Sequence, residues 1–248
     1  MDHLVSIYHS APLLFWIGGS IAVYLLIIHG WWQIRNRSFG SLPYGRWLVE
    51  IGRFLFYLGI PYLALGGWPR GPYQGLLAPD DLGWVGVHER WSPARWVGAI
   101  GAGFGLGLVA FLILLLAWVN THRITGPMRF RFQPLPWWVV GIDLLYQEVH
   151  WAFYRAALGV ALRDAYAGVF LGLGLVYLEW GLNPFWRRDW TVEEHVAGRW
   201  LHLALALISA ILFLFTRNLW VCLAVHGALE FTFRLLGRER RPEEAPTG

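Results

Sequence analysis

The sequence has no lysine, a single cysteine and few charged residues of either sign. Charged residues make up 15% of the 248 positions, whereas hydrophobic residues make up 56%. A soluble domain carries about 25% charged residues because its surface must be solvated, so this deficit favours an integral membrane protein. With Cys222 as the only cysteine, an intrachain disulfide is excluded.

The positive charge of the chain lies in its loops and its tail. A net charge of +4, carried entirely by arginine among the strongly basic residues, suits contact with anionic lipid headgroups. No nucleic-acid-binding motif accompanies it. We therefore expect membrane lipids as partners and no nucleic acid.

Apolar segments long enough to cross a bilayer recur along the chain. About 20 apolar residues span the roughly 30 Å hydrocarbon layer at about 1.5 Å per residue. The first segment is preceded by no basic region and followed by no small-residue cleavage site, so we predict a retained span. The sequence predicts an all-α membrane protein with about seven transmembrane helices, at 11–32, 47–67, 95–119, 137–160, 164–182, 199–216 and 218–236.

The chain is predicted to form one transmembrane domain over 1–236, followed by a polar tail at 237–248 that we expect to be disordered and cytoplasmic. With the N-terminus outside, thirteen arginines fall in inner segments and five in outer loops. Basic residues accumulate in cytoplasmic loops. We therefore predict a multi-pass protein of the cytoplasmic membrane with its C-terminus inside.

Glycines in the third and fifth spans recur with the spacing that lets helix backbones approach closely. The pairs are Gly101 and Gly105, Gly103 and Gly107, and Gly168 and Gly172. Tight internal packing is the favoured interpretation, with oligomerisation as the alternative. In the second span, Glu50 and Arg53 lie three residues apart on one face and predict a structural ion pair.

The fourth span carries ionisable side chains on two faces. At 100° per residue, Asp143, Gln147, His150 and Tyr154 form one stripe, while Glu148 and Arg155 form another. Burying such groups costs at least about 2.5–3.5 kcal/mol each at the centre of a membrane helix, so they need partners or a wet cavity.

The seventh span supplies His226 and Glu230, four residues apart and so on one face. Such a pair can hold a metal or polarise a water. Counted along their spans, Glu148, His150, His226 and Glu230 lie near mid-membrane, and we expect them to converge. Glu179 is a plausible further member and His202 a marginal one.

Three runs in the last four predicted spans carry a family resemblance. They are His150-Trp-Ala-Phe-Tyr-Arg155, Leu175-Val-Tyr-Leu-Glu179 and Thr216-Arg-Asn-Leu-Trp-Val-Cys-Leu-Ala-Val-His226-Gly-Ala-Leu-Glu230. The first resembles the E-E-x-x-x-R of the CPBP family, the CAAX-protease and bacteriocin-processing membrane proteases. The second stands near the family's F-x-x-x-H, and the third is similar to its final H-x-x-x-N/D motif. The resemblance covers 137–236, with glutamate and histidine exchanged at His150 and Glu179.

This resemblance implies a CAAX-type, prenyl-protease-like intramembrane endopeptidase. Glu148 or Glu179 would be the general base on a water held by His150 and His226, directly or through a divalent metal such as zinc. Glu230 would orient that water, and Arg155 would stabilise charge or fix Glu148. The implied substrate is a membrane-associated peptide or protein with a prenylated or hydrophobic terminus.

Other interpretations stay open at this point. His195 precedes His226 by a family-like gap and is an alternative third ligand. The chain can also be a non-catalytic partner or assembly factor of a membrane complex, whose polar core only fixes helix packing. A small transporter is disfavoured because no inverted repeat or pair of broken helices is visible.

Overall fold

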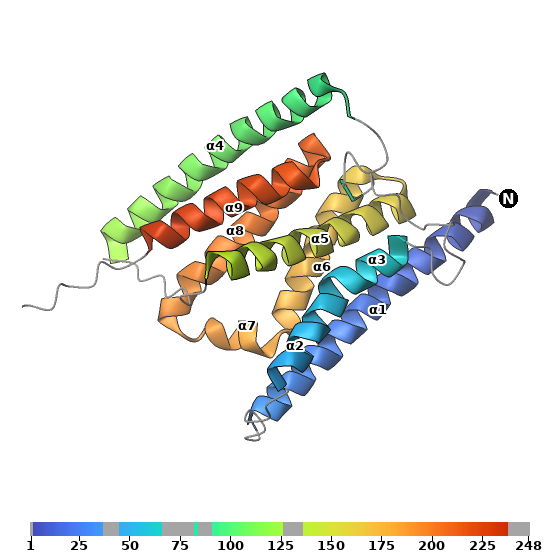
Figure 1. Ribbon diagram of the computed structural model, residues 1–248, viewed down its shortest axis with the longest axis horizontal. Coiled ribbons are helices and arrows are strands. Elements are labelled where there is room, and N and C mark those ends of the chain that lie inside the picture. The colour runs from blue at the N-terminus through green and yellow to red at the C-terminus, as the bar shows by residue number, and fades with distance from the viewer. Residues whose placement is uncertain (1, 37–44, 66–81, 84–90, 126–135, 238–248) are drawn as a thin grey trace, which may run out of the picture.

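The computed structural model describes residues 2–36, 45–65, 82–83, 91–125 and 136–237, and within these ranges the chain is almost entirely helical, without a strand (Figure 1). The described elements are α1 (Asp2–Asn36), α2 (Gly45–Phe54), η2 (Leu55–Gly59), α3 (Ile60–Leu65), α4 (Pro93–Thr125), α5 (Trp137–Leu162), α6 (Ala165–Leu182), α7 (Pro184–Asp189), α8 (Glu193–Thr216) and α9 (Leu219–Leu236). The all-α class is therefore confirmed.

Five helices in the described part are long and apolar enough to cross a membrane: Leu13–Gln33, Pro93–Ile124, Ala165–Leu182, His195–Thr216 and Leu219–Leu236. The other two predicted spans are also helical, one as α2, η2 and α3 in succession and one as α5. A multi-pass helical membrane protein is thus supported, while the count of seven spans stays a prediction. Apart from Gly237, the predicted tail lies outside the described residues.

Helix α5 is the central element of the bundle. Figure 1 shows α1 with α2 and α3 along one side, and α4 beside α9 on the opposite side. Helix α5 packs against α1, α6, α9 and η2, so neighbours surround it on several sides. Its residues from Glu148 to Ala157 are all buried. A helix in this position can carry polar side chains because they face protein rather than lipid.

Glycines bring α6 and α4 close to their neighbours. A Cβ at Gly168 would lie 2.4 Å from Gly159 Cα, and one at Gly172 would lie 2.9 Å from the Arg155 backbone nitrogen. On α4, a Cβ at Gly103 would meet the Val221 side chain. The predicted close packing is thus found for Gly168, Gly172, Gly103 and Gly107, whereas a Cβ at Gly101 or Gly105 would have no neighbour within 4 Å.

A π-helical turn interrupts the second helical segment at Leu55–Gly59. Pro61 follows it in sequence, and a proline lacks the backbone N–H that an α-helix needs at that position. The wider turn carries Phe56 and Tyr57, whose rings lie 4.4 and 5.4 Å from the His150 ring between centroids. Turns of this kind are frequent at functional sites.

Short capped turns fix where the last helices begin. Arg163 adopts φ 55° at the end of α5, and the next residue, Asp164, accepts hydrogen bonds from the Tyr166 and Ala167 backbone amides at the start of α6. Asn218 caps α9 in the same way after Arg217, which adopts φ 49°. Side-chain caps of this kind satisfy the free amides of a first helical turn. They hold α6 and α9 in fixed register against α5 and α8.

Candidate functional site

The first polar group on α5 is a carboxylate–imidazole pair formed with α6. His150 Nε2 lies 3.2 Å from Glu179 Oε2, and the side chains are 1% and 4% exposed. The Tyr154 hydroxyl donates to Glu179 Oε1 and also lies 3.1 Å from Ser20 Oγ of α1. Residues from three helices thus fix this pair, called below the His150–Glu179 pair.

This pair lies on the wall of a cavity of about 680 Å³. Besides the pair itself, the polar lining residues are Tyr24, Arg53, Gln147, Asn183, Arg188, Asp189, His195, Arg199 and His202. Apolar lining comes mainly from the aromatic rings of Phe56, Tyr57, Trp151, Trp180 and Trp186. A concave site where apolar rings and converging polar groups meet has the general form of a ligand-binding site.

The second polar group is buried between α5, α8 and α9. Glu148 is 0% exposed and has three partners: the Ser209 hydroxyl at 2.8 Å, Arg155 Nη2 at 3.2 Å and His226 Nδ1 at 2.8 Å. Because Arg155 and Ser209 also contact each other at 3.1 Å, the group is closed on itself. We call these four residues the Glu148 cluster.

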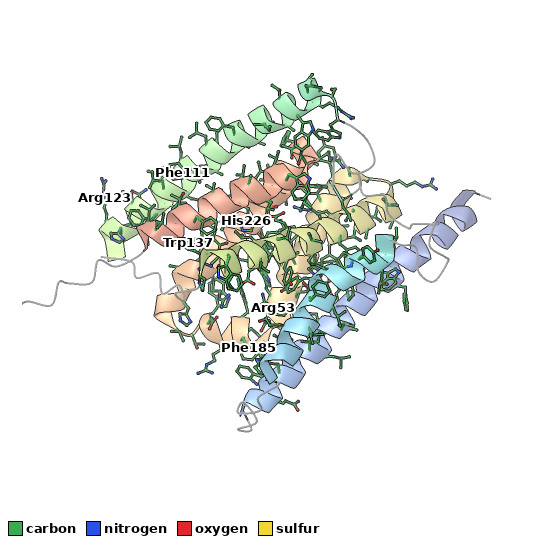
Figure 2. The ribbon with its side chains drawn as sticks, viewed as in Figure 1. Arg53, Phe111, Arg123, Trp137, Phe185 and His226 are labelled. Carbon is green, nitrogen blue, oxygen red and sulfur yellow. The ribbon has the colours of Figure 1, made fainter. Side chains whose placement is uncertain are left out.

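Glu230 extends the Glu148 cluster toward the end of α9. Its Oε2 lies 3.5 Å from His226 Nε2, and its Oε1 accepts from Arg234 Nε at 2.9 Å. His202 of α8 lies 4.0 Å from the same carboxylate and also lines the cavity. Figure 2 labels His226, which projects from α9 toward α5. The Trp151 ring stacks on the His226 ring with centroids 5.4 Å apart.

The sequence predicted that Glu148, His150, His226 and Glu230 converge at one point, but the structure places them in two separate groups. Glu148, His226 and Glu230 form one group, and His150 contacts Glu179 in another. Among the described residues, no hydrogen bond or ion pair joins the first group to the His150–Glu179 pair. The reason is helical geometry, since residues 148 and 150 are about 200° apart around α5 at about 100° per residue. Both faces of the central helix are thus polar.

Single contacts in the structure test two other predictions from the sequence, the Glu50–Arg53 ion pair and His195 as an alternative ligand. The Glu50–Arg53 ion pair is confirmed at 3.3 Å, and Arg53 additionally reaches Asp143 Oδ1 at 2.5 Å. The ion-pair partner of Asp143 is therefore Arg53 of α2. His195 lies 3.2 Å from Asp189 of α7 and lines the cavity, so it does not join His226.

Sequence reasoning missed Ser209, Ser20 and Arg234. Ser209 and Ser20 are 0% exposed in otherwise apolar helices, and each contacts a member of a polar group. A lone hydroxyl inside an apolar run is a weak signal, because a membrane serine often bonds only to its own helix backbone. Arg234, four residues after Glu230, had the spacing of an ion pair and could have been found.

The positions of His150 and His226 bear on whether one metal ion could bind both imidazoles, as the resemblance implied. Within the described ranges, no three His, Cys, Asp or Glu side chains form a group that could hold a metal ion. His150 Nε2 and His226 Nδ1 each face a different carboxylate. No contact between these two imidazoles is recorded among the described residues, and no step proposed below passes through a metal.

A scan against protein-family models finds no match, and searches of curated proteins and of solved structures find none either. The functional argument therefore depends on the geometry of this chain.

Proposed function

We propose that the chain is an intramembrane hydrolase of the CPBP type, which cleaves a peptide bond with a water activated by the His150–Glu179 pair. The observation that carries this proposal is a buried carboxylate–imidazole pair on the wall of a 680 Å³ cavity. A carboxylate that orients an imidazole is the arrangement general-base catalysis requires.

The hydrogen bonds define the state of the imidazole. Glu179 accepts from Tyr154 and, as a carboxylate, accepts from His150 Nε2–H as well. His150 then keeps its lone pair on Nδ1, a buried atom with no hydrogen-bond partner among the described residues, so the reaction requires a water to enter beside it. In the proposed reaction, Nδ1 takes a proton from a cavity water while the water oxygen attacks the substrate carbonyl. Glu179 stabilises the resulting imidazolium, which then gives its proton to the leaving amine as the peptide C–N bond breaks.

The cavity supplies the other requirements of hydrolysis. Tyr57 and Gln147 line it beside His150 and can donate hydrogen bonds to the oxyanion that forms on the carbonyl. The rings of Trp151, Trp180 and Trp186 offer an apolar surface for a hydrophobic peptide segment. The substrate class that follows is a membrane-associated peptide with an apolar terminus.

The family resemblance supports the same pair. His150 stands in the place of a family glutamate and Glu179 near that of a family histidine. Because these two residues contact each other, the same two chemical groups meet between the same two helices with their order exchanged. In this proposal Glu148, Arg155, His226 and Glu230 have positioning roles, since they hold α5, α8 and α9 together beside the cavity.

Orientation follows from the charge distribution. The cavity reaches α7 and the start of α8, where Arg188 and Arg199 line it. The sequence predicts an inner position for these arginines, because basic residues accumulate there. We propose that the cavity opens toward the cytoplasm and that the substrate enters from that side.

The test compares variants by profiling new protein termini. Host membranes containing the wild type are compared by mass spectrometry with membranes containing Glu179→Gln or His150→Asn. Wild-type-dependent termini should fall by at least about a hundredfold in both variants, which is the usual effect of losing a general base. The matched controls are Glu50→Gln and His29→Asn, both exposed side chains, which should leave the termini unchanged.

Thermal unfolding of each purified variant separates catalysis from folding. Absence of wild-type-dependent termini, or full cleavage by a folded Glu179→Gln variant, would overturn the hydrolase proposal. The non-catalytic partner role would then be the better account of the polar core.

A further inference from the structure

Helix α7 crosses between α6 and α8 at the end of the bundle where several spans terminate. The span in α1 ends at Gln33, the α6 span ends at Leu182, and the α8 span begins at His195. Helix α7 occupies Pro184–Asp189, directly between the last two (Figure 1). It is too short to cross a bilayer, so it lies at the level where the apolar spans meet the polar layer.

Aromatic rings fix the inner face of α7. Trp186 is 8% exposed and stacks on Trp180 with centroids 4.6 Å apart. Phe185 meets Trp32 of α1 edge-on at 4.8 Å. Aromatic side chains of this kind favour the boundary between hydrocarbon and headgroups. These contacts leave the residues after Trp186 facing outward.

Arg187 and Arg188 are those outward residues, and both are exposed. Neither has an ion-pair or hydrogen-bond partner for its guanidinium among the described side chains. Asp189, the neighbouring acid, is already paired with His195 and Arg199. As far as the described side chains go, the charge of two adjacent guanidinium groups is thus left uncompensated.

An open surface hollow of about 620 Å³ lies in front of these arginines, lined by Trp32, Pro184, Arg187, Arg188 and Thr191. Its lining thus combines two apolar side chains, Trp32 and Pro184, with two guanidinium groups. Arg188 also lines the large cavity, so the two spaces adjoin at this residue.

We propose that this hollow binds the phosphate of an anionic phospholipid headgroup, with Arg187 and Arg188 as its ligands. A guanidinium presents paired donors that match phosphate oxygens, and two of them can hold one phosphate from two sides. Trp32 and Pro184 provide the apolar contact that the glycerol and upper acyl chain require. A free phosphate ion would gain nothing from those two apolar side chains, which is why the lipid is the favoured occupant.

The proposal places a lipid at the mouth of the cavity. Because Arg188 lines both spaces, a bound headgroup borders the route by which a substrate would enter. Lipid binding does not depend on the hydrolase proposal, and its assay involves no cleavage.

Native mass spectrometry of the purified full chain tests the site with two named lipids. Phosphatidylglycerol and phosphatidylcholine are titrated separately into the detergent-solubilised protein. We expect one phosphatidylglycerol to be retained at least about tenfold more tightly than phosphatidylcholine. The double variant Arg187→Gln/Arg188→Gln should weaken that binding by about tenfold or more, because each arginine near an anionic lipid contributes on the order of 1 kcal/mol.

The matched control is Arg163→Gln/Arg217→Gln. These two arginines are also exposed and lie in the α5–α6 and α8–α9 turns, so the control removes the same charge elsewhere. It should change phosphatidylglycerol binding by less than about twofold. If both double variants lose phosphatidylglycerol binding equally, the effect comes from net charge and the proposal is overturned. Equal retention of the two lipids by the wild type would also overturn it. Displacement by millimolar inorganic phosphate would show a free-phosphate site instead and would also overturn it.

Discussion

Removal of the Glu148 carboxylate tests whether the Glu148 cluster holds the bundle together. Glu148→Leu keeps a side chain of similar volume but takes away the partner of Arg155, Ser209 and His226. Arg155 is 3% exposed, so its charge would be left buried without compensation.

Two magnitudes compete in this substitution. A hydrogen bond between membrane helices contributes about 0.6 kcal/mol on average, so the two lost interhelical contacts, to Ser209 and His226, would cost about 1.2 kcal/mol. A buried ion pair broken on one side costs about 3–5 kcal/mol, because one charge remains unpaired. The stranded guanidinium is therefore the larger effect, and we expect a loss of about 3–5 kcal/mol of unfolding free energy.

The assay is equilibrium unfolding in mixed micelles with increasing denaturing detergent, followed by the fluorescence of the 17 tryptophans. Ser209→Ala, which removes the hydrogen bonds of Ser209 to Glu148 and to Arg155, should lose only about 1.2 kcal/mol. Glu50→Leu is the exposed-carboxylate control, because its side chain is 51% exposed and Arg53 keeps Asp143; it should lose less than about 1 kcal/mol.

The double variant Glu148→Leu/Arg155→Met decides the cause. Removing both charges should restore at least about 2 kcal/mol relative to Glu148→Leu, since apolar replacements of a buried pair are often neutral. A double variant as unstable as the single one would refute the reasoning, because the loss could not then come from an unpaired Arg155.

Two further outcomes are expected. Gly172→Ala should lower the unfolding free energy by about 1–3 kcal/mol, because its Cβ would lie 2.9 Å from the Arg155 backbone nitrogen. Gly174→Ala is the control and should leave the unfolding free energy unchanged, because a Cβ there would have no neighbour within 4 Å. Equal values for the two variants in the same unfolding assay would contradict the packing argument. In a Cys222→Ala background, an impermeant maleimide should label Arg70→Cys in intact cells and Arg187→Cys only after permeabilisation, and the reverse pattern would overturn the N-out orientation.

Several elements were predictable because they depend on local pattern. The sequence predicted helices at 137–160, 164–182 and 218–236, and the structure has Trp137–Leu162, Ala165–Leu182 and Leu219–Leu236. Apolar length and the caps Asp164 and Asn218 determine such boundaries. The π-turn at Leu55–Gly59 was not predicted, since it depends on how the helix packs around Pro61 and His150.

The sequence predicted most residues of the candidate site, but not all of the contacts between them. His226 with Glu230 and Glu148 with Arg155 follow from spacing along one helix, and both contacts are found. The partners His150 and Glu179 are 29 residues apart and meet only because glycines let α6 approach α5 closely. No spacing rule within one helix reaches such a contact.

The sequence by itself determined that this is an apolar, helical membrane chain whose costly ionisable groups lie in the fourth, fifth and seventh predicted spans, because length, hydropathy and charge act residue by residue. Only the tertiary structure decided that those groups form two clusters on opposite faces of α5, that one borders a cavity, and that α7 leaves two arginines facing outward. Which side chains meet depends on the rotation and approach of neighbouring helices, and that is set by packing over the whole bundle.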